Sequence, residues 1–247
     1  MFMSTGQMFG NQNSGGGGGG SDFSKVMILL GWEDADGTTS ITDESAAPHT
    51  FTEAGNAQID TAQFKFGASS GLFDGSGDEW NCPANANLRL SQANSDQFTV
   101  ETWIRPASGT TFTNHSIIGQ GDTDGNLSWK FMVVDGGLRF SFSPSGSGWT
   151  NITTAAFLLG TGSFVHAMVD KDATGKIRLY VNGTMQASST PADSSFHNST
   201  DVVRIGMPCF GGDPMNGHLD ELRVTVGKAW CGNDAGFTPP TAAFPRS

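Results

Sequence analysis

The chain has 247 residues, of which 36% are hydrophobic and 10% aromatic, so it can bury a sizeable core and global disorder is excluded. Its formal net charge of −11 would repel nucleic-acid phosphates and anionic membranes, so we expect no nucleic-acid partner and no membrane insertion. Its three cysteines have no C-x-x-C spacing and indicate neither a zinc site nor a disulfide framework.

Residues 1–24 differ in composition from the rest of the chain. They include six consecutive glycines ending at Gly20, which have no side chains to bury and a high entropic cost of ordering. Phe2, Met8 and Phe9 lie on the distal side of this glycine tether. We expect residues 1–24 to form an extended anchoring arm whose apolar side chains dock on a partner. The alternative is an unstructured terminus.

From residue 25 onward the chain shows the signals of short strands. Runs rich in Val, Ile, Leu, Phe and Trp are bounded by Gly, Asn, Asp and Ser, and Asn182-Gly183 has the residue pair of a two-residue hairpin turn. The pattern predicts an all-β domain over residues 25–247, an antiparallel two-sheet β-sandwich or jelly roll. The predicted strands are 26–32, 98–104, 127–134, 138–142, 164–170, 177–181, 202–205 and 219–226.

The end of the chain follows a different pattern from the strands. Residues 236–245 read GFTPPTAAFP, and a segment so rich in proline cannot continue a β-ladder. We therefore expect the chain to close a sheet with strand 219–226 and then to lie across that sheet.

Several segments, taken together in their order, resemble one known family. They are "FGASSGLFDG" from Phe66, "FTVETWIRP" from Phe98, "FVHAMVDKDATGKIRLYVNG" from Phe164, the opening "LLGWEDADGTTSITDES" from Leu29, and the ending described above. This set resembles the laminin G-like, concanavalin A-like lectin-glucanase modules of tailed-bacteriophage virion proteins. The resemblance covers residues 26–245 and implies a concanavalin A-like sandwich.

The resemblance also implies a function class. We expect a non-enzymatic virion structural protein, a capsid or tail decoration protein made in the host cytoplasm without a secretion signal and displayed in many copies or as a homo-oligomer. Its expected partners are other virion proteins, bound through the arm, and host-surface polysaccharide. The alternative is a free carbohydrate-binding, lectin-like module. The glucanases of this fold carry Glu-x-Asp-x-Glu on one strand, and no glutamate here begins that pattern, so we expect no catalytic residue.

Acidic residues of the first loop are candidate ligands of a structural Ca²⁺ ion. The resemblance implies a site between Asp34, Asp36 and Asp43 of that loop and the acidic pair Asp220-Glu221 of the final strand, and carboxylates are the hard ligands that Ca²⁺ prefers. The alternative is that these are turn-forming and surface acids. A second acidic segment, GDTDGN, lacks an acid at its twelfth position, and we interpret it as a hairpin turn.

Exposed tryptophans beside amides are candidate sugar-binding residues, since sugars stack on aromatic faces and bond to amide groups. Trp149, in the Gly/Ser-rich loop PSGSGWTN, is the best candidate, followed by Trp80 with its neighbour Asn81. The tryptophans that alternate within predicted strands are expected in the core; they are Trp32, Trp103 and Trp129.

Overall fold

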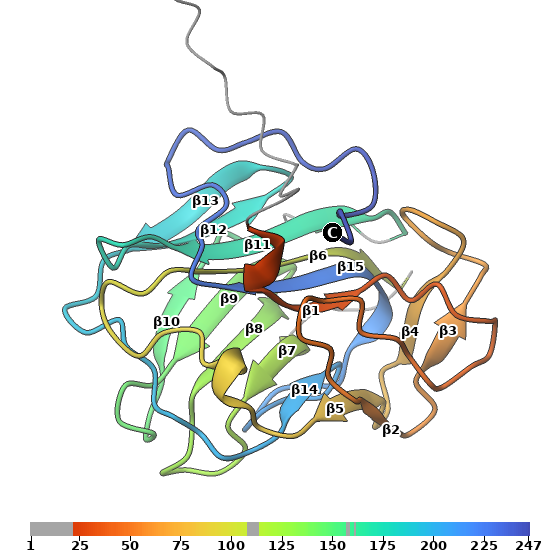
Figure 1. Ribbon diagram of the computed structural model, residues 1–247, viewed down its shortest axis with the longest axis horizontal. Coiled ribbons are helices and arrows are strands. Elements are labelled where there is room, and N and C mark those ends of the chain that lie inside the picture. Colours follow the sequence, from red (N-terminus) through yellow and green to blue (C-terminus); the bar gives the residue numbers. More distant parts are fainter. Residues whose placement is uncertain (1–21, 108–113, 157–158, 161) are drawn as a thin grey trace, which may run out of the picture.

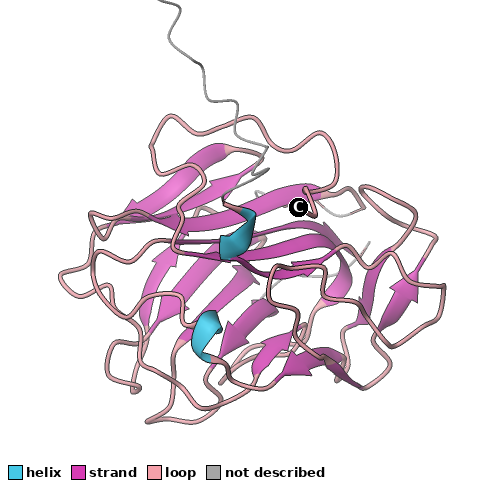
Figure 2. Cartoon of the chain, viewed as in Figure 1, coloured by secondary structure: helices cyan, strands magenta, loops and turns pink. Residues whose placement is uncertain are grey.

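The structure is a computed structural model, and it describes residues 22–107, 114–156, 159–160 and 162–247. Two antiparallel sheets pack face to face, and the helices in this part of the chain are two single 3₁₀ turns, Phe23–Lys25 and Ala86–Leu88 (Figures 1 and 2). The predicted all-β, two-sheet sandwich is confirmed.

Sheet A has eight strands in the part of the chain that the structure describes. In spatial order they are β13 (Thr184–Ser189), β12 (Ile177–Val181), β11 (Val165–Lys171), β6 (Phe98–Pro106), β15 (Asn216–Val226), β4 (Ser70–Asp74) and β3 (Gln58–Asp60), with β1 (Val26–Leu30) also paired to β15. The hairpin turn predicted at Asn182-Gly183 joins β12 to β13, which pair antiparallel.

Sheet B comprises seven strands among the described residues. In spatial order they are β10 (Thr150–Thr153), β9 (Gly137–Phe142), β8 (Trp129–Val134), β7 (Asn114–Gln120), β14 (Val203–Ile205), β5 (Glu79–Cys82) and β2 (Thr52–Ala54). The predicted hairpin turn GDTDGN joins β7 to β8, which pair antiparallel.

The core lies between the two sheets and forms one large apolar cluster. Alternate residues of each strand point inward, as the period of two in a β-strand requires. Burial of this surface is the main term that stabilises the fold, at about 25 cal/mol per Å² of apolar area. Representative members are Val100, Val169 and Leu179 from sheet A, and Phe131, Phe140 and Ile205 from sheet B.

The C-terminal segment crosses the outer face of sheet A, which confirms the expectation drawn from its proline content (Figure 1). The backbone N–H of Trp230 donates to the Thr99 hydroxyl at 3.0 Å, and that of Phe237 donates to the Gly183 carbonyl at 2.9 Å. Phe244 then packs in a small cluster formed around β1. Sheet A is therefore covered on both faces.

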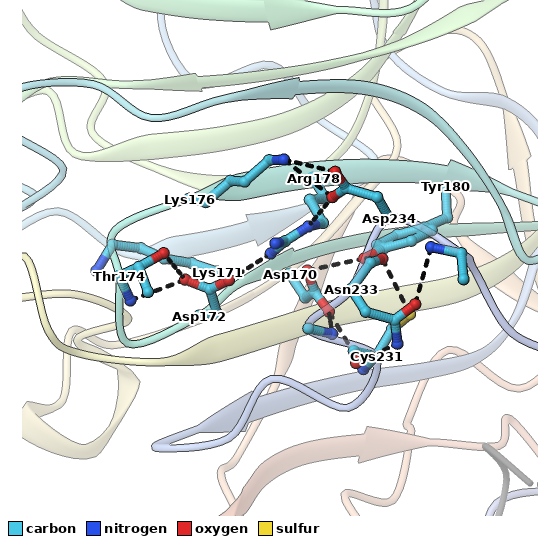
Figure 3. A network of polar contacts seen from close by, with 12 residues as sticks. Asp170, Lys171, Asp172, Thr174, Lys176, Arg178, Tyr180, Cys231, Asn233 and Asp234 are labelled. Carbon is cyan, nitrogen blue, oxygen red and sulfur yellow. Dashed lines mark hydrogen bonds and ion pairs between the residues drawn. The ribbon is translucent and has the colours of Figure 1, made fainter. Parts of the chain in front are cut away.

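A polar network fixes this C-terminal segment to β11 and β12 (Figure 3). The Asp170 carboxylate accepts the Gly232 N–H at 2.7 Å, and the Tyr180 hydroxyl donates to a carbonyl of the segment at 2.9 Å. Arg178 bonds to Asp234 at 2.7 Å. Burial raises the pKa of Asp170 to about 6. These side chains are engaged with one another, so we interpret the network as structural.

The anchoring residues Phe2, Met8 and Phe9 lie outside the described residues, and the arm stays a prediction. Within the described ranges, no helix is long and apolar enough to cross a bilayer.

Candidate functional site

Four loops meet at one end of sheet B, formed by residues 83–89, 121–128, 143–149 and 195–202. The strand ends from which they emerge are matched across the sheet, so the loops share one end of the sandwich. The residues at these strand ends pair with one another across the sheet in the order Thr150, Phe142, Trp129, Gln120, Val203 and Cys82.

Hydrogen bonds tie these loops to each other. The Leu127 N–H donates to the Gly146 carbonyl at 2.9 Å, and the His197 N–H donates to the Ser143 carbonyl at 2.7 Å. Loop 195–202 therefore has a fixed position, with Phe196 buried in the core, although most of its residues are polar and it belongs to a long connection without regular structure.

A groove of about 220 Å³ opens between two of these loops. Its polar lining consists of amide, hydroxyl and guanidinium groups, and two alanines complete the lining. The lining residues are Ala84, Asn85, Ala86, Arg89, Asn198, Ser199 and Thr200. Such a surface can form many hydrogen bonds with a small polar ligand and offers no carboxylate.

Local structure holds Arg89 at the edge of the groove. Asn85 caps the 3₁₀ turn by accepting the Asn87 N–H at 3.2 Å. The buried side chains of Leu88 and Leu90 anchor the chain on either side of Arg89. The Arg89 side chain is exposed and forms no hydrogen bond or ion pair with any described residue.

Trp149 ends loop 143–149, at the same end of the sandwich. Its side chain is half-buried, and the Lys130 Nζ lies 4.7 Å from the centroid of its ring. Lys130 also donates to the Phe210 carbonyl at 2.9 Å, and burial lowers the pKa of Lys130. The ring is thus fixed from one side by a cation and partly open to solvent. A role for Trp149 in sugar binding stays a prediction.

Trp80 is not exposed, although it is predicted from the sequence as an exposed sugar-binding residue. The side chain is fully buried, packs against Phe73 at 5.2 Å between ring centroids, and donates its Nε1–H to the Thr39 carbonyl at 2.7 Å. The cause is strand alternation: Trp80 and Asn81 are neighbours on β5, so their side chains point to opposite faces of sheet B. Asn81 remains partly exposed and donates to Glu79 at 2.8 Å.

The first-loop acids act as caps for backbone amides. Asp34 accepts the Thr42 N–H at 3.2 Å and Asp36 accepts the Thr61 N–H at 3.0 Å. Asp43 is buried and accepts the Leu29 N–H at 3.0 Å. This arrangement agrees with the alternative that these are turn-forming acids.

Asp220 also accepts hydrogen bonds from backbone amides. It is buried in β15 and accepts the Lys65 N–H at 2.6 Å and the Phe66 N–H at 3.1 Å. Burial raises the pKa of Asp220 to about 7. Among the described residues, no three His, Cys, Asp or Glu side chains are grouped so that they could hold a metal ion. The sequence-based hypothesis of a Ca²⁺ site therefore has no ligand cluster to support it.

A buried charged cluster lies beneath the C-terminal segment. Arg223 donates to one carboxylate oxygen of Glu101 at 2.9 and 2.6 Å, and His166 lies 3.2 Å from the other oxygen. Burial raises the pKa of Glu101, but the charge of Arg223 and the hydrogen bond of His166 outweigh it, so the pKa is lowered. Glu101 and His166 have almost no solvent exposure, so this cluster is structural.

The groove residues were missed by the sequence analysis. Asn85 and Arg89 lie more than a hundred positions before the segment 198–200 in the sequence. The residue types in both segments are those of any polar loop. The only usable signal was the dense run of polar residues around residue 198, and such a run does not identify the loop against which it packs.

Comparisons with known proteins support the fold. The sequence profile of the Concanavalin A-like lectin/glucanases superfamily matches residues 74–226. No curated protein sequence matches this chain significantly.

Several solved structures share the architecture. The binding domain of Paraclostridial Mosquitocidal Protein 1 has a TM-score of 0.63 at 17% identity, covering 84% of this chain and 50% of that one. The botulinum neurotoxin serotype C1 binding domain has a TM-score of 0.64 at 15% identity, covering 87% and 51%. The serotype D binding domain gives 0.62 at 15%, covering 83% and 49%. At these identities the likeness shows the fold, and this chain spans about half the length of those chains.

Proposed function

Because this chain belongs to the Concanavalin A-like lectin/glucanases superfamily, we propose that it is a carbohydrate-binding module that holds a sugar in the groove at the end of sheet B. The observation that carries the proposal is the groove itself. Its amide, hydroxyl and guanidinium groups converge from two fixed loops, and they match the hydrogen-bonding hydroxyls of a sugar ring.

We propose further that the module has no catalytic activity of its own. Glycoside hydrolysis requires two carboxyl groups about 5 to 10 Å apart around the scissile bond. No carboxylate is found among the described residues that line the groove. The names of the similar solved structures describe binding domains, which is consistent with a binding role.

Single shallow sites of this kind bind sugars in the high micromolar to millimolar range, about −4 to −6 kcal/mol. Useful adhesion then needs many linked copies, because linkage makes later binding events intramolecular. We propose display on a phage particle, anchored through residues 1–24, and the support is the resemblance of the sequence motifs to virion modules. The rival is a free lectin-like module.

Particle attachment can be tested separately from sugar binding. Deleting residues 1–22 should leave the melting temperature nearly unchanged and abolish incorporation into particles. Full decoration by the truncated protein would contradict anchoring through the arm, whereas no incorporation of the full-length chain would favour the rival.

Sugar binding can be tested with a glycan array, comparing the wild type with Asn198→Ala. Asn198 is exposed and lines the groove, so its loss should weaken binding without affecting the fold. Asn56→Ala changes an exposed asparagine outside the groove and is the matched control. If no glycan binds the wild type, the proposed function is wrong.

A further inference from the structure

We infer that the groove at the end of sheet B takes an acidic sugar, one that carries a carboxylate, and that Arg89 selects for its charge. This inference rests on the proposed carbohydrate-binding function and adds the class of ligand. It is drawn from three features of the groove: the free guanidinium of Arg89, the hydrogen-bond donors left over beside it, and the engagement of the nearby acids.

The first feature is that Arg89 lacks an internal partner. Four of the seven arginines of this acidic protein form ion pairs with carboxylates among the described residues, whereas Arg89, Arg105 and Arg139 form none; the paired ones are Arg178, Arg204, Arg223 and Arg246. Arg89 has no such contact among the described residues, and yet its backbone is held between two buried leucines. An unpaired guanidinium that lines a groove offers a planar fork of donors to a carboxylate.

The second feature is an excess of donors beside Arg89. The side-chain oxygens of Asn85, Ser199 and Thr200 each already accept one N–H from inside the protein, at 3.2, 3.1 and 3.3 Å. Among the described residues, no acceptor pairs with the Asn85 side-chain amide hydrogens or with the two hydroxyl hydrogens, so these donors remain available to a ligand. A carboxylate accepts hydrogen bonds and donates none, and this set of groups suits it.

The third feature is that the acids nearest to the groove are already engaged. The Asp201 carboxylate accepts the Asp122 N–H at 2.6 Å, and the Asp122 carboxylate lies 3.3 Å from the Arg204 guanidinium. Asp201 is bonded to a neutral N–H and Asp122 shares Arg204 with Glu79, and neither aspartate is among the described residues that line the groove. The described lining of the groove thus holds one cation, Arg89, and no carboxylate that would compete with a ligand for it.

The consequence is selectivity by charge. Hydrogen bonds to charged groups contribute about 1.5–3 kcal/mol, against about 1 kcal/mol for neutral ones. An acidic sugar should therefore bind about tenfold more tightly than its neutral counterpart at low ionic strength. Salt screens an exposed pair, so the preference should shrink as salt is added.

The test is to titrate the full chain separately with D-glucuronic acid, D-glucose and acetate and to monitor binding by NMR, at low and at high salt. We expect glucuronic acid to bind most tightly, with glucose about tenfold weaker and acetate without measurable affinity. In Arg89→Gln the two sugars should bind equally. Arg105→Gln removes an arginine that forms no ion pair elsewhere in the described chain, and it should behave as the wild type.

The outcomes separate the two proposals. Equal binding of glucose and glucuronic acid to the wild type would overturn the charge inference and leave the carbohydrate-binding function standing. Binding of acetate as tight as that of glucuronic acid would overturn it too, because the site would then hold an adventitious anion. A preference that survives in Arg89→Gln would show that another residue selects the charge. If neither sugar binds and a broad glycan array is also negative, the proposed function itself fails.

Discussion

Asn126 and Thr200 hold each other through two reciprocal hydrogen bonds. The Thr200 N–H donates to Asn126 Oδ1 at 3.2 Å, and Asn126 Nδ2 donates to the Thr200 hydroxyl at 3.3 Å. The pair joins the β7–β8 hairpin loop to the loop that precedes β14, and Thr200 lines the groove. The shape of the groove therefore depends on Asn126, which is not among the described residues that line it.

This relationship predicts that Asn126→Ala weakens sugar binding without direct contact with the sugar. Loss of an exposed hydrogen-bonded pair should cost about 1 kcal/mol of stability. Sugar affinity should fall about threefold to tenfold, because the freed loop must be ordered on binding. Calorimetric titration and thermal melts measure both effects. Thr200→Ser keeps both hydrogen bonds and should match the wild type; unchanged affinity in Asn126→Ala would contradict the role of the pair.

Trp149 provides a second prediction. Trp149→Ala should weaken adsorption of multivalent protein to host-envelope polysaccharide more than it weakens folding, because the half-exposed ring is a stacking platform. Loss of its cation–π contact with Lys130 should cost about 0.5–1 kcal/mol. Trp149→Phe retains an aromatic face and should retain most of the adsorption. Normal adsorption of the alanine variant would remove Trp149 from the binding surface.

The buried ion pair predicts a large stability effect. Glu101→Gln leaves the buried guanidinium of Arg223 without its countercharge, and such a change costs about 3–5 kcal/mol. Urea denaturation should show this loss. The matched control is Glu53→Gln, which changes a glutamate outside this cluster and should shift stability by less than about 0.5 kcal/mol. Similar midpoints for the two variants would contradict the assigned importance of the pair.

Stability should also depend on pH through Asp220. Its pKa is raised to about 7 in the folded protein, above the ordinary value of 3.8, so the native state binds this proton more tightly than the unfolded chain does. The stability that it contributes is greatest at acid pH and is lost as the pH rises toward 7, by about 1.4 kcal/mol for each pH unit that separates the folded and unfolded pKa values.

Denaturation of the wild type and Asp220→Asn at pH 5 and pH 8 tests this dependence. An asparagine can still accept the N–H groups of Lys65 and Phe66 through its side-chain oxygen. The variant should therefore lose less stability than the wild type between the two pH values. A difference between the two proteins that stays constant with pH would contradict the raised pKa.

Much of the fold could be predicted from the sequence, because most strongly apolar strands are visible as short apolar runs bounded by turn residues. The predicted strand 177–181 coincides with β12, and 98–104 falls within β6. The predicted strands leave out β2, β3, β4, β5, β7, β10 and β13. Short polar strands such as Thr52–Ala54 carry no apolar alternation and are defined by the neighbours with which they pair, and the two isoleucines of β7 are too few to mark it as a strand. Trp32, Trp103 and Trp129 are buried, as predicted.

The candidate site could not be predicted in the same way. Trp80 has polar neighbours in sequence, and only the pairing of β5 with β14 shows that its ring points into the core. Arg89 and Thr200 come together because the matched ends of β5 and β14 bring their loops to one edge. Strand pairing over such a separation leaves no local pattern in the sequence.

The central claim is that the groove between residues 84–89 and 198–200 binds sugar, and amide chemical-shift mapping tests it most directly. Addition of D-glucuronic acid to the ¹⁵N-labelled protein should shift the backbone amides of Asn85, Arg89 and Thr200 progressively. The amide of Gly232, in the structural network under the C-terminal segment, should not move. Shifts confined to other surfaces, or none at millimolar sugar for any glycan that the protein retains on an array, would contradict the account.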